Sequence, residues 1–215
     1  MTYNWELSPP IPACGDDDPD VVFRGVGKVM TGWETIEFEL SRLYSVFAGD
    51  PDGEAMREYG ENTIARLRLD ALSRKADEFF IRKPSQEREG KFASIICQLR
   101  FFASRRNEVA HGIVFDVQKI KAFTEHFHRS VRGKPQYALI APYHQLKQHA
   151  PDGLPAYAYT SLILEAMIPA MAKPFAQLDR FRRSLLAREK SPSVLSRPSA
   201  GKEKKRRRNV GQRRG

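Results

Sequence analysis

The stretch "VGKVMTGWETIEFELSRLYSVF" (residues 26–47) decides the fold class of this 215-residue chain. Its apolar residues recur at three- and four-residue spacing, so they form one stripe along a long helix. The stripe consists of Val26, Val29, Met30, Trp33, Ile36, Leu40, Leu43 and Phe47. We expect this helix to begin at about Asp20, with Asp20 as its N-cap, and to end in the Gly- and Pro-containing segment 48–54.

Two further helices are expected in the next sixty residues. The second should run from Glu54 to Ile81, because Pro84 then interrupts the helical pattern. The third should start near Ser85 and end at Gly112, a residue suited to the left-handed position just past a helix. Both carry apolar residues at helical spacing, so each can pack one face against the first helix.

The last third of the chain is less regular. The segment 117–130 resembles a short helix, and "YALIAPY" (137–143) and "AYAYT" (156–160) resemble two short strands that pair as a hairpin. A final helix is expected over 160–168, and Pro169 and Pro174 should kink or split it. Equally, Pro174 could be the first residue of a new helix over 174–188.

These elements predict an all-α fold, namely a four- to five-helix bundle with a small β-hairpin insertion. The predicted organisation is an irregular lead-in (1–19), a helical domain (20–188) with the hairpin insertion at 133–159, and a disordered basic tail (189–215).

Charge is concentrated in the tail. The net charge is +10, and the tail contributes +8 through ten Lys or Arg and two Glu, which leaves +2 for residues 1–188. A folded domain this close to neutral is not a broad basic platform for nucleic acid. The run Lys204, Lys205, Arg206, Arg207 and Arg208 is expected to attract RNA without sequence preference.

Other features narrow the class of protein. No apolar run is long enough to cross a bilayer, and the N-terminus lacks the pattern of a signal peptide. Two cysteines are too few for a disulfide framework or a zinc site, so a cytoplasmic location is the default expectation. His126 and His128 point to opposite sides of a helix, and His144 and His149 have no acidic neighbours, so we expect no metal site and no cofactor.

The stretch "RRNEVAHGIV" (105–114) at the end of the third helix contains candidate residues for a functional site. Arg106 lies seven residues after Leu99, so it points within about 20° of that apolar stripe position. Asn107 and His111 are four residues apart, so the amide oxygen of Asn107 can orient the imidazole. Arg106 and His111 diverge by about 140° on a straight helix. To act on one substrate they need the last turn to open at Gly112, or a second copy of the motif from a partner chain.

These residues resemble the motif of the HEPN superfamily (higher eukaryotes and prokaryotes nucleotide-binding), which is Arg, four to six residues, then His, often with a polar residue after the Arg. Here the match is Arg106, Asn107, "EVA" and His111. The placement of the motif at the end of a helix that follows two long helices is also similar. The resemblance covers roughly residues 20–188.

The resemblance implies metal-independent RNA cleavage by a symmetric homodimer with a composite site. His111 would then be the general base or acid, Arg106 would bind the scissile phosphate, and Asn107 would orient the histidine or contact the phosphate. Glu34 or Glu37 on the first helix would hold Arg106, and we favour Glu37 because it lies between Trp33 and Leu40 on the helical wheel. A boundary glutamate with no such role is an equal alternative. Some toxic members of the family are neutralised by a nucleotidyltransferase or another antitoxin, so a toxin or defence effector with such a partner is also implied.

Two other functions remain open. The chain could be a non-catalytic HEPN-like module that binds RNA or a nucleotide, or a helical scaffold whose motif is accidental. Four aromatic residues in the hairpin region could stack on bases or cover the hairpin's apolar side. They are Tyr137, Tyr143, Tyr157 and Tyr159.

Overall fold

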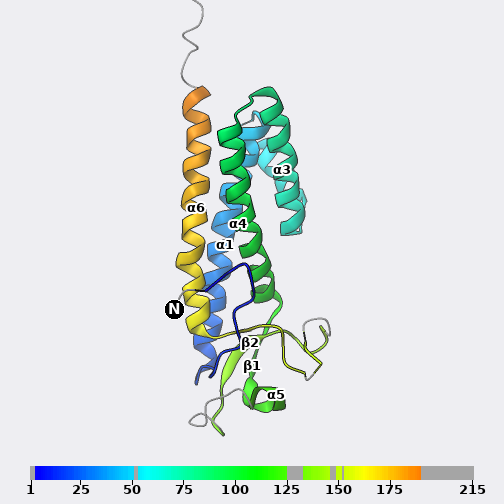
Figure 1. Ribbon diagram of the computed structural model, residues 1–215, viewed down its shortest axis with the longest axis vertical. Helices are drawn as coiled ribbons and strands as arrows, with labels where there is room; N and C mark the ends of the chain where they lie inside the picture. Colours follow the sequence, from blue (N-terminus) through cyan, green and yellow to red (C-terminus); the bar gives the residue numbers. More distant parts are fainter. Residues whose placement is uncertain (1–2, 51–52, 125–132, 146–148, 152, 190–215) are drawn as a thin grey trace, which may run out of the picture.

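The computed structural model is a helical bundle with a small sheet at one end (Figure 1). It describes residues 3–50, 53–124, 133–145, 149–151 and 153–189. The helices of the bundle are α1 (Pro19–Ala48), α2 (Glu54–Glu61), α3 (Ala65–Arg82), α4 (Gln86–His111) and α6 (Ser161–Glu189). The predicted class, a helical bundle with a small hairpin, is confirmed.

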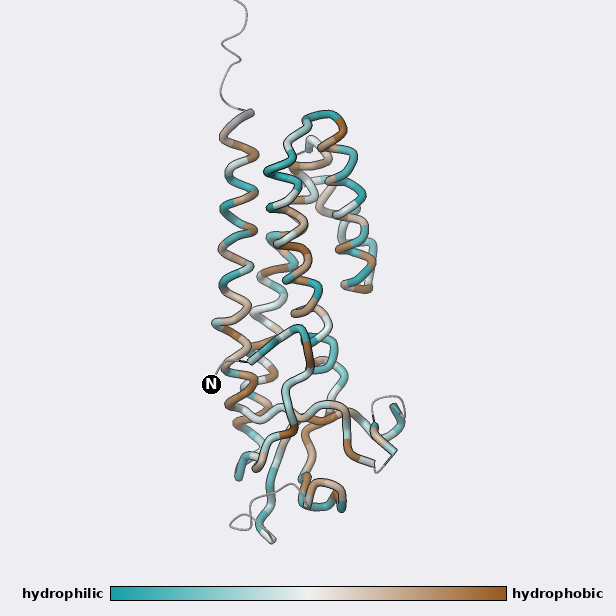
Figure 2. The backbone as a smooth tube through the Cα atoms, viewed as in Figure 1, coloured by the Kyte–Doolittle hydropathy of each residue, from teal (hydrophilic) through white to brown (hydrophobic). Residues whose placement is uncertain are grey.

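Helix α1 is the central element, because it packs against α2, α3, α4 and α6. Its predicted stripe forms the middle of the core, where Trp33, Leu40 and Phe47 are fully buried. Hydrophilic and hydrophobic residues alternate along each long helix, as a one-sided stripe requires (Figure 2). None of the helices in the described part of the chain combines the length and apolarity needed to cross a bilayer.

Two helix boundaries differ from the prediction. The N-cap of α1 is Asp18, whose side chain accepts a hydrogen bond from the Asp20 amide at 2.9 Å, and Pro19 occupies the first helical position. Asp20 lies in the first turn, where its charge favours the helix dipole. The predicted helix 54–81 is divided into α2 and α3, because the segment between them turns so that both can pack on α1.

The last helix is continuous although Pro169 and Pro174 lie inside it, so the predicted split is wrong. Helix α6 runs along α1, and Leu164, Met171 and Leu178 on its buried face are at most 3% exposed. The burial of that face outweighs the hydrogen bonds that two prolines remove.

Gly112 is not left-handed, in contrast to the prediction. Its φ of −75° and ψ of 163° are extended, so the chain leaves α4 directly into a strand. A Cβ atom at this position would lie 2.8 Å from Cγ of Leu139 and 3.0 Å from the Glu108 carbonyl oxygen. The glycine is therefore explained by the close approach of the second strand to the end of α4.

The sheet consists of β1 (Ile113–Asp116), β2 (Tyr137–Ile140) and β3 (Ala158–Tyr159), antiparallel in the order β1-β2-β3. The expected hairpin is β2 and β3, and β1 adds a third strand. One face packs on the bundle. The other covers a second small core with the 3₁₀-helix η1 (Val117–Lys119) and the short helix α5 (Lys121–Thr124). The rest of the expected short helix, 125–130, lies outside the described residues.

The described part of the N-terminal lead-in has no helix or strand before α1, and it contacts the domain at several points. Asp16 pairs with the backbone of Tyr137, and its carboxylate accepts hydrogen bonds from both the amide and the hydroxyl of Ser161 at the start of α6. The ring of Trp5 lies 6.1 Å from that of Phe102 on α4. These residues therefore belong to the packed domain and not to a separate segment.

Two glycines of α1 give a matched test of the α1–α6 contact. A Cβ at Gly25 would lie 2.9 Å from Cβ of Leu164, whereas a Cβ at Gly27 meets nothing within 4 Å. We expect Gly25→Ala to destabilise the protein by about 1–3 kcal/mol through overpacking. Gly27→Ala should stabilise it by about 0.5–1 kcal/mol, because alanine favours a helix. Urea unfolding of both variants measures this, and a stabilising Gly25→Ala would contradict the close packing.

Candidate functional site

The three residues of the motif lie in the last two turns of α4. This helix stays α-helical through His111, so the last turn does not open. Arg106 and His111 therefore point about 140° apart on one chain. Of the two arrangements that would bring them to one substrate, only the second copy from a partner chain is compatible with this geometry.

Arg106 is held weakly. Its side chain is 23% exposed, its Nη2 lies 3.4 Å from Oε1 of Glu34, and its Nη1 lies 3.4 Å from Oδ1 of Asn107. Its Nε is buried and has no hydrogen-bond partner among the described residues. Glu34 is 60% exposed, so solvent screens the pair. The guanidinium thus has a donor unused and two long contacts that a tighter acceptor can displace.

Glu37 is not the partner of Arg106, so the choice of Glu37 over Glu34 is wrong. Its carboxylate is buried and accepts hydrogen bonds from Trp33 Nε1 at 3.0 Å and Tyr59 Oη at 2.8 Å. Arg68 Nη1 lies 3.5 Å away. The break between α2 and α3, which periodicity did not reveal, brings Tyr59 and Arg68 to Glu37. Glu34, one turn earlier on α1, faces α4 instead.

His111 is exposed, and within the described residues no hydrogen bond or ion pair reaches its ring. The expected hydrogen bond from Asn107 is not formed, because Oδ1 of Asn107 faces Arg106. The imidazole is thus accessible to solvent and to a ligand.

A neighbouring polar cluster was not anticipated from the sequence. Arg105 is 8% exposed, and its Nη2 lies 2.8 Å from Oε1 of Glu108. Ser8 of the N-terminal segment donates to the same oxygen at 2.9 Å, and Tyr159 donates to Oε2 of Glu108. The spacing gave a signal: Arg105 lies three residues after Phe102 and four before Val109, both of which are buried. The most buried arginine of the motif region is therefore Arg105, and not Arg106.

The raised pKa of Tyr59 should make the stability of the protein depend on pH in the alkaline range. Burial raises the pKa of Tyr59 above its usual value, and the charge and hydrogen bond of Glu37 raise it further. The unfolded chain loses this proton above about pH 10 while the folded protein keeps it, so the free energy of unfolding should fall by about 1.4 kcal/mol per pH unit from this group. Urea unfolding between neutral and alkaline pH should show a shallower fall for Tyr59→Phe. Equal slopes would contradict the assignment.

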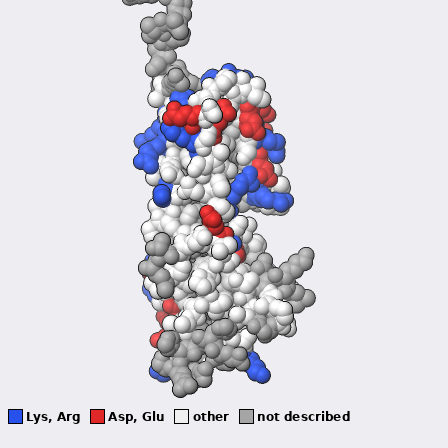
Figure 3. Space-filling view, in the orientation of Figure 1, with Lys and Arg blue, Asp and Glu red and all other residues white. Residues whose placement is uncertain are grey.

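Several other predicted residues give no site in this structure. Lys204, Lys205, Arg206, Arg207 and Arg208 lie outside the described residues, as do His126 and His128. Within the residues that can be placed, no group of three or more His, Cys, Asp or Glu side chains is arranged to hold a metal ion. Figure 3 shows positive and negative side chains interspersed on the visible face of the bundle, in agreement with its small net charge.

Comparisons with known proteins add no assignment. No family model matches the chain, and the comparisons with curated proteins and with solved structures also return no match.

Proposed function

We propose that the chain is a metal-independent endoribonuclease whose active site combines Arg106, Asn107 and His111 with the same residues of a second copy. The observation that carries the proposal is the state of Arg106. Its side chain is 23% exposed, its Nε has no partner among the described residues, and its two contacts are 3.4 Å long. An arginine side chain held in this way should bind a phosphate, through two parallel hydrogen bonds, more tightly than it binds Glu34 and Asn107. The resemblance to the HEPN motif supports the same assignment.

The proposed reaction needs no group beyond the protein and RNA. The 2′-oxygen of a ribose attacks the adjacent phosphorus, and the bond from phosphorus to the 5′-oxygen of the next nucleotide breaks. An imidazole of His111 accepts the 2′-hydroxyl proton, or a protonated imidazole donates a proton to the departing 5′-oxygen, and solvent water exchanges the other proton. Arg106 stabilises the charge that grows on the phosphate oxygens, and Asn107 holds the guanidinium. The products are a 2′,3′-cyclic phosphate and a free 5′-hydroxyl.

A homodimer is part of this proposal, because His111 and Arg106 of one chain face different directions. Two α4 ends related by a two-fold axis can place the His111 of one chain beside the Arg106 of the other. A toxin or defence role, held in check by an antitoxin or a nucleotidyltransferase, fits such an enzyme and is proposed on the family resemblance alone.

A non-catalytic module that binds RNA or a nucleotide is the second candidate. The divergence of Arg106 and His111 within one chain favours it, as does the near-neutral charge of residues 1–188. It predicts RNA binding without cleavage.

Incubation of the purified full chain with single-stranded RNA in EDTA tests the proposal. We expect cleavage with 2′,3′-cyclic phosphate ends, and no cleavage of single-stranded DNA, which lacks the attacking hydroxyl. Intact RNA at micromolar protein would reject the nuclease and leave the binding module.

Phe38 is expected to lie in the dimer interface. It is 59% exposed and lies one turn from Glu34 on the same face of α1, which places it beside the Arg106 contact. We expect Phe38→Asp to give a monomer and to remove most cleavage, since a charge replaces buried apolar area at the interface. Light scattering at micromolar concentration measures the first effect. Phe23→Asp, similarly exposed at 56% and about 22 Å away along α1, is the control and should remain dimeric.

A further inference from the structure

A cavity of about 400 Å³ opens on the face of the sheet that points away from the bundle. It lies between the sheet, α5 and the described residues that follow β2. This volume lies within the range typical of small-ligand sites. Six of its lining residues carry the argument. They are Ile113, Phe115, Lys119, Lys121, Tyr143 and His149.

The cavity presents aromatic side chains to solvent. Phe115 is 37% exposed and Tyr143 is 78% exposed, although aromatic side chains of this size are usually more buried. The ring of Tyr143 meets that of His149 edge to face, with the centroids 5.7 Å apart. Because Tyr143 is 78% exposed, most of its surface is open to a ligand. By contrast, Tyr157 and Tyr159 are at most 1% exposed and are packed in the hydrophobic core. Of the tyrosines considered as stacking candidates, Tyr143 is the one that is open to a ligand base.

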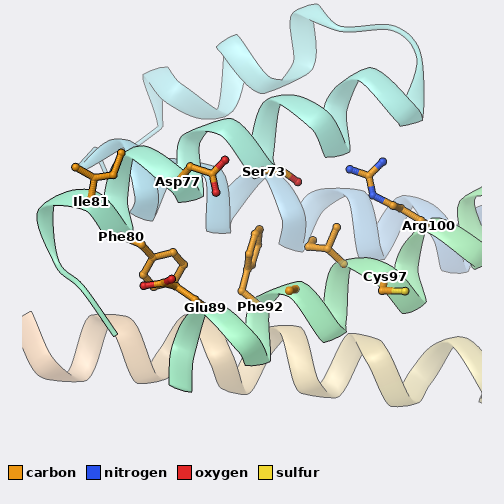
Figure 4. A pocket seen from close by; sticks show the side chains of 10 residues that line it. Ser73, Asp77, Phe80, Ile81, Glu89, Phe92, Cys97 and Arg100 are labelled. Carbon is orange, nitrogen blue, oxygen red and sulfur yellow. The ribbon is translucent and has the colours of Figure 1, made fainter. Parts of the chain in front are cut away.

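The charge of the lining favours an anionic ligand. The described residues that line the cavity include Lys119, Lys121 and His149, and none of them is acidic. A second cavity, of about 610 Å³ between α3 and α4, differs in this respect, because Asp77 and Glu89 border it (Figure 4). The lining combines aromatic rings with cationic side chains, of which Lys119 also lies 3.8 Å from Asp116. Such a combination matches a base and its phosphates.

The cavity also adjoins the proposed active site. Ile113 forms part of its wall and follows His111 after Gly112 alone. Two residues of extended chain span at most about 7 Å, so the wall begins within about that distance of the His111 backbone. A nucleotide whose phosphate is near His111 can therefore place its base in the cavity.

We propose that this cavity binds one base of single-stranded RNA, stacked on Tyr143 and Phe115, with Lys119 and Lys121 near the adjoining phosphates. The position of the cavity relative to cleavage rests on the proposed nuclease function. The site accepts any base with a π-face and selects single strands, because a base paired within a duplex cannot enter it.

The experiment uses the full chain and two fluorescent probes of equal length and charge. One is a 2′-O-methyl oligoribonucleotide, which cannot be cleaved by 2′-hydroxyl attack, and the other is an abasic phosphodiester. Anisotropy is measured at about 0.2 M salt, which weakens purely electrostatic attraction. We expect the parent protein to bind the base-containing probe about tenfold more tightly. Tyr143→Ala should lose this preference. Tyr143→Phe, which keeps the ring, and Ile81→Ala, a change at an 80% exposed residue at the far end of α3, should both retain it.

Equal binding of the two probes by the parent, or an unchanged preference in Tyr143→Ala, would overturn the proposal. Cleavage of natural RNA is scored separately. A parent that cleaves but shows no base preference keeps the nuclease and loses this cavity as its base site. A parent that shows a preference dependent on Tyr143 but does not cleave supports the cavity and rejects the nuclease.

Discussion

His111→Ala is expected to lower the rate of RNA cleavage by about 10²–10⁴-fold, which is the usual contribution of a general acid or base. The side chain is exposed, and no hydrogen bond or ion pair reaches it from the described residues, so its removal should leave the fold intact. A single-turnover cleavage assay in EDTA measures the loss, and circular dichroism and light scattering verify that structure is unchanged.

The matched control is His144→Ala, which removes another exposed histidine outside the motif and should cleave at the parent rate. Arg106→Lys gives a second comparison, because lysine keeps the charge but loses the two-pronged geometry that holds a phosphate. It should cleave more slowly than the parent. Full activity in His111→Ala would refute the catalytic role of the histidine, whatever the protein does to RNA.

Arg182→Met is expected to destabilise the fold by about 3 kcal/mol. The side chains of Arg182 and Glu39 are 6% and 5% exposed, and Nε of Arg182 binds Oε1 of Glu39, which joins α6 to α1. Removal of the arginine leaves a buried carboxylate whose remaining ion-pair partner among the described residues is Arg42, at 3.1 Å from its other oxygen. Urea unfolding, monitored by circular dichroism, gives the difference.

Arg183→Met provides the control for Arg182→Met, since both arginines contact Asp179 and differ in burial. Arg183 is 72% exposed, so its loss should change stability by no more than about 0.5 kcal/mol. The double variant Glu39→Leu/Arg182→Met should recover much of the loss, because it removes both buried charges. Equal losses of stability in the two single variants would show that the buried Arg182–Glu39 ion pair contributes no more to stability than the exposed Arg183–Asp179 pair.

The core stripe of α1 could be predicted from the sequence because it depends only on residues that are close together in the chain. Trp33, Leu40 and Phe47 repeat at helical spacing, and all three are fully buried. The same local information located the end of α4 and the strands of the hairpin. It also identified Arg106, Asn107 and His111 as neighbours on one helix, since that follows from position along the chain.

The partner of Arg106 could not be read in the same way. Glu34 and Glu37 both flank the stripe of α1, and the wheel does not show which neighbouring helix each of them faces. The choice depends on the turn between α2 and α3, which brings Tyr59 and Arg68 to Glu37. Likewise, position 112 requires a glycine because Leu139, 27 positions further along, packs against it.

The sequence by itself determined the class of fold, the stripe of α1 and the spacing of the Arg–His motif, because helical periodicity is a local property. Only the tertiary structure decided that Glu37 is buried among core residues, that α6 continues through two prolines, and that Arg106 is held by two contacts of 3.4 Å while His111 is exposed. Those outcomes depend on contacts between residues far apart in the chain, where burial and buried polar pairing outweigh local preference.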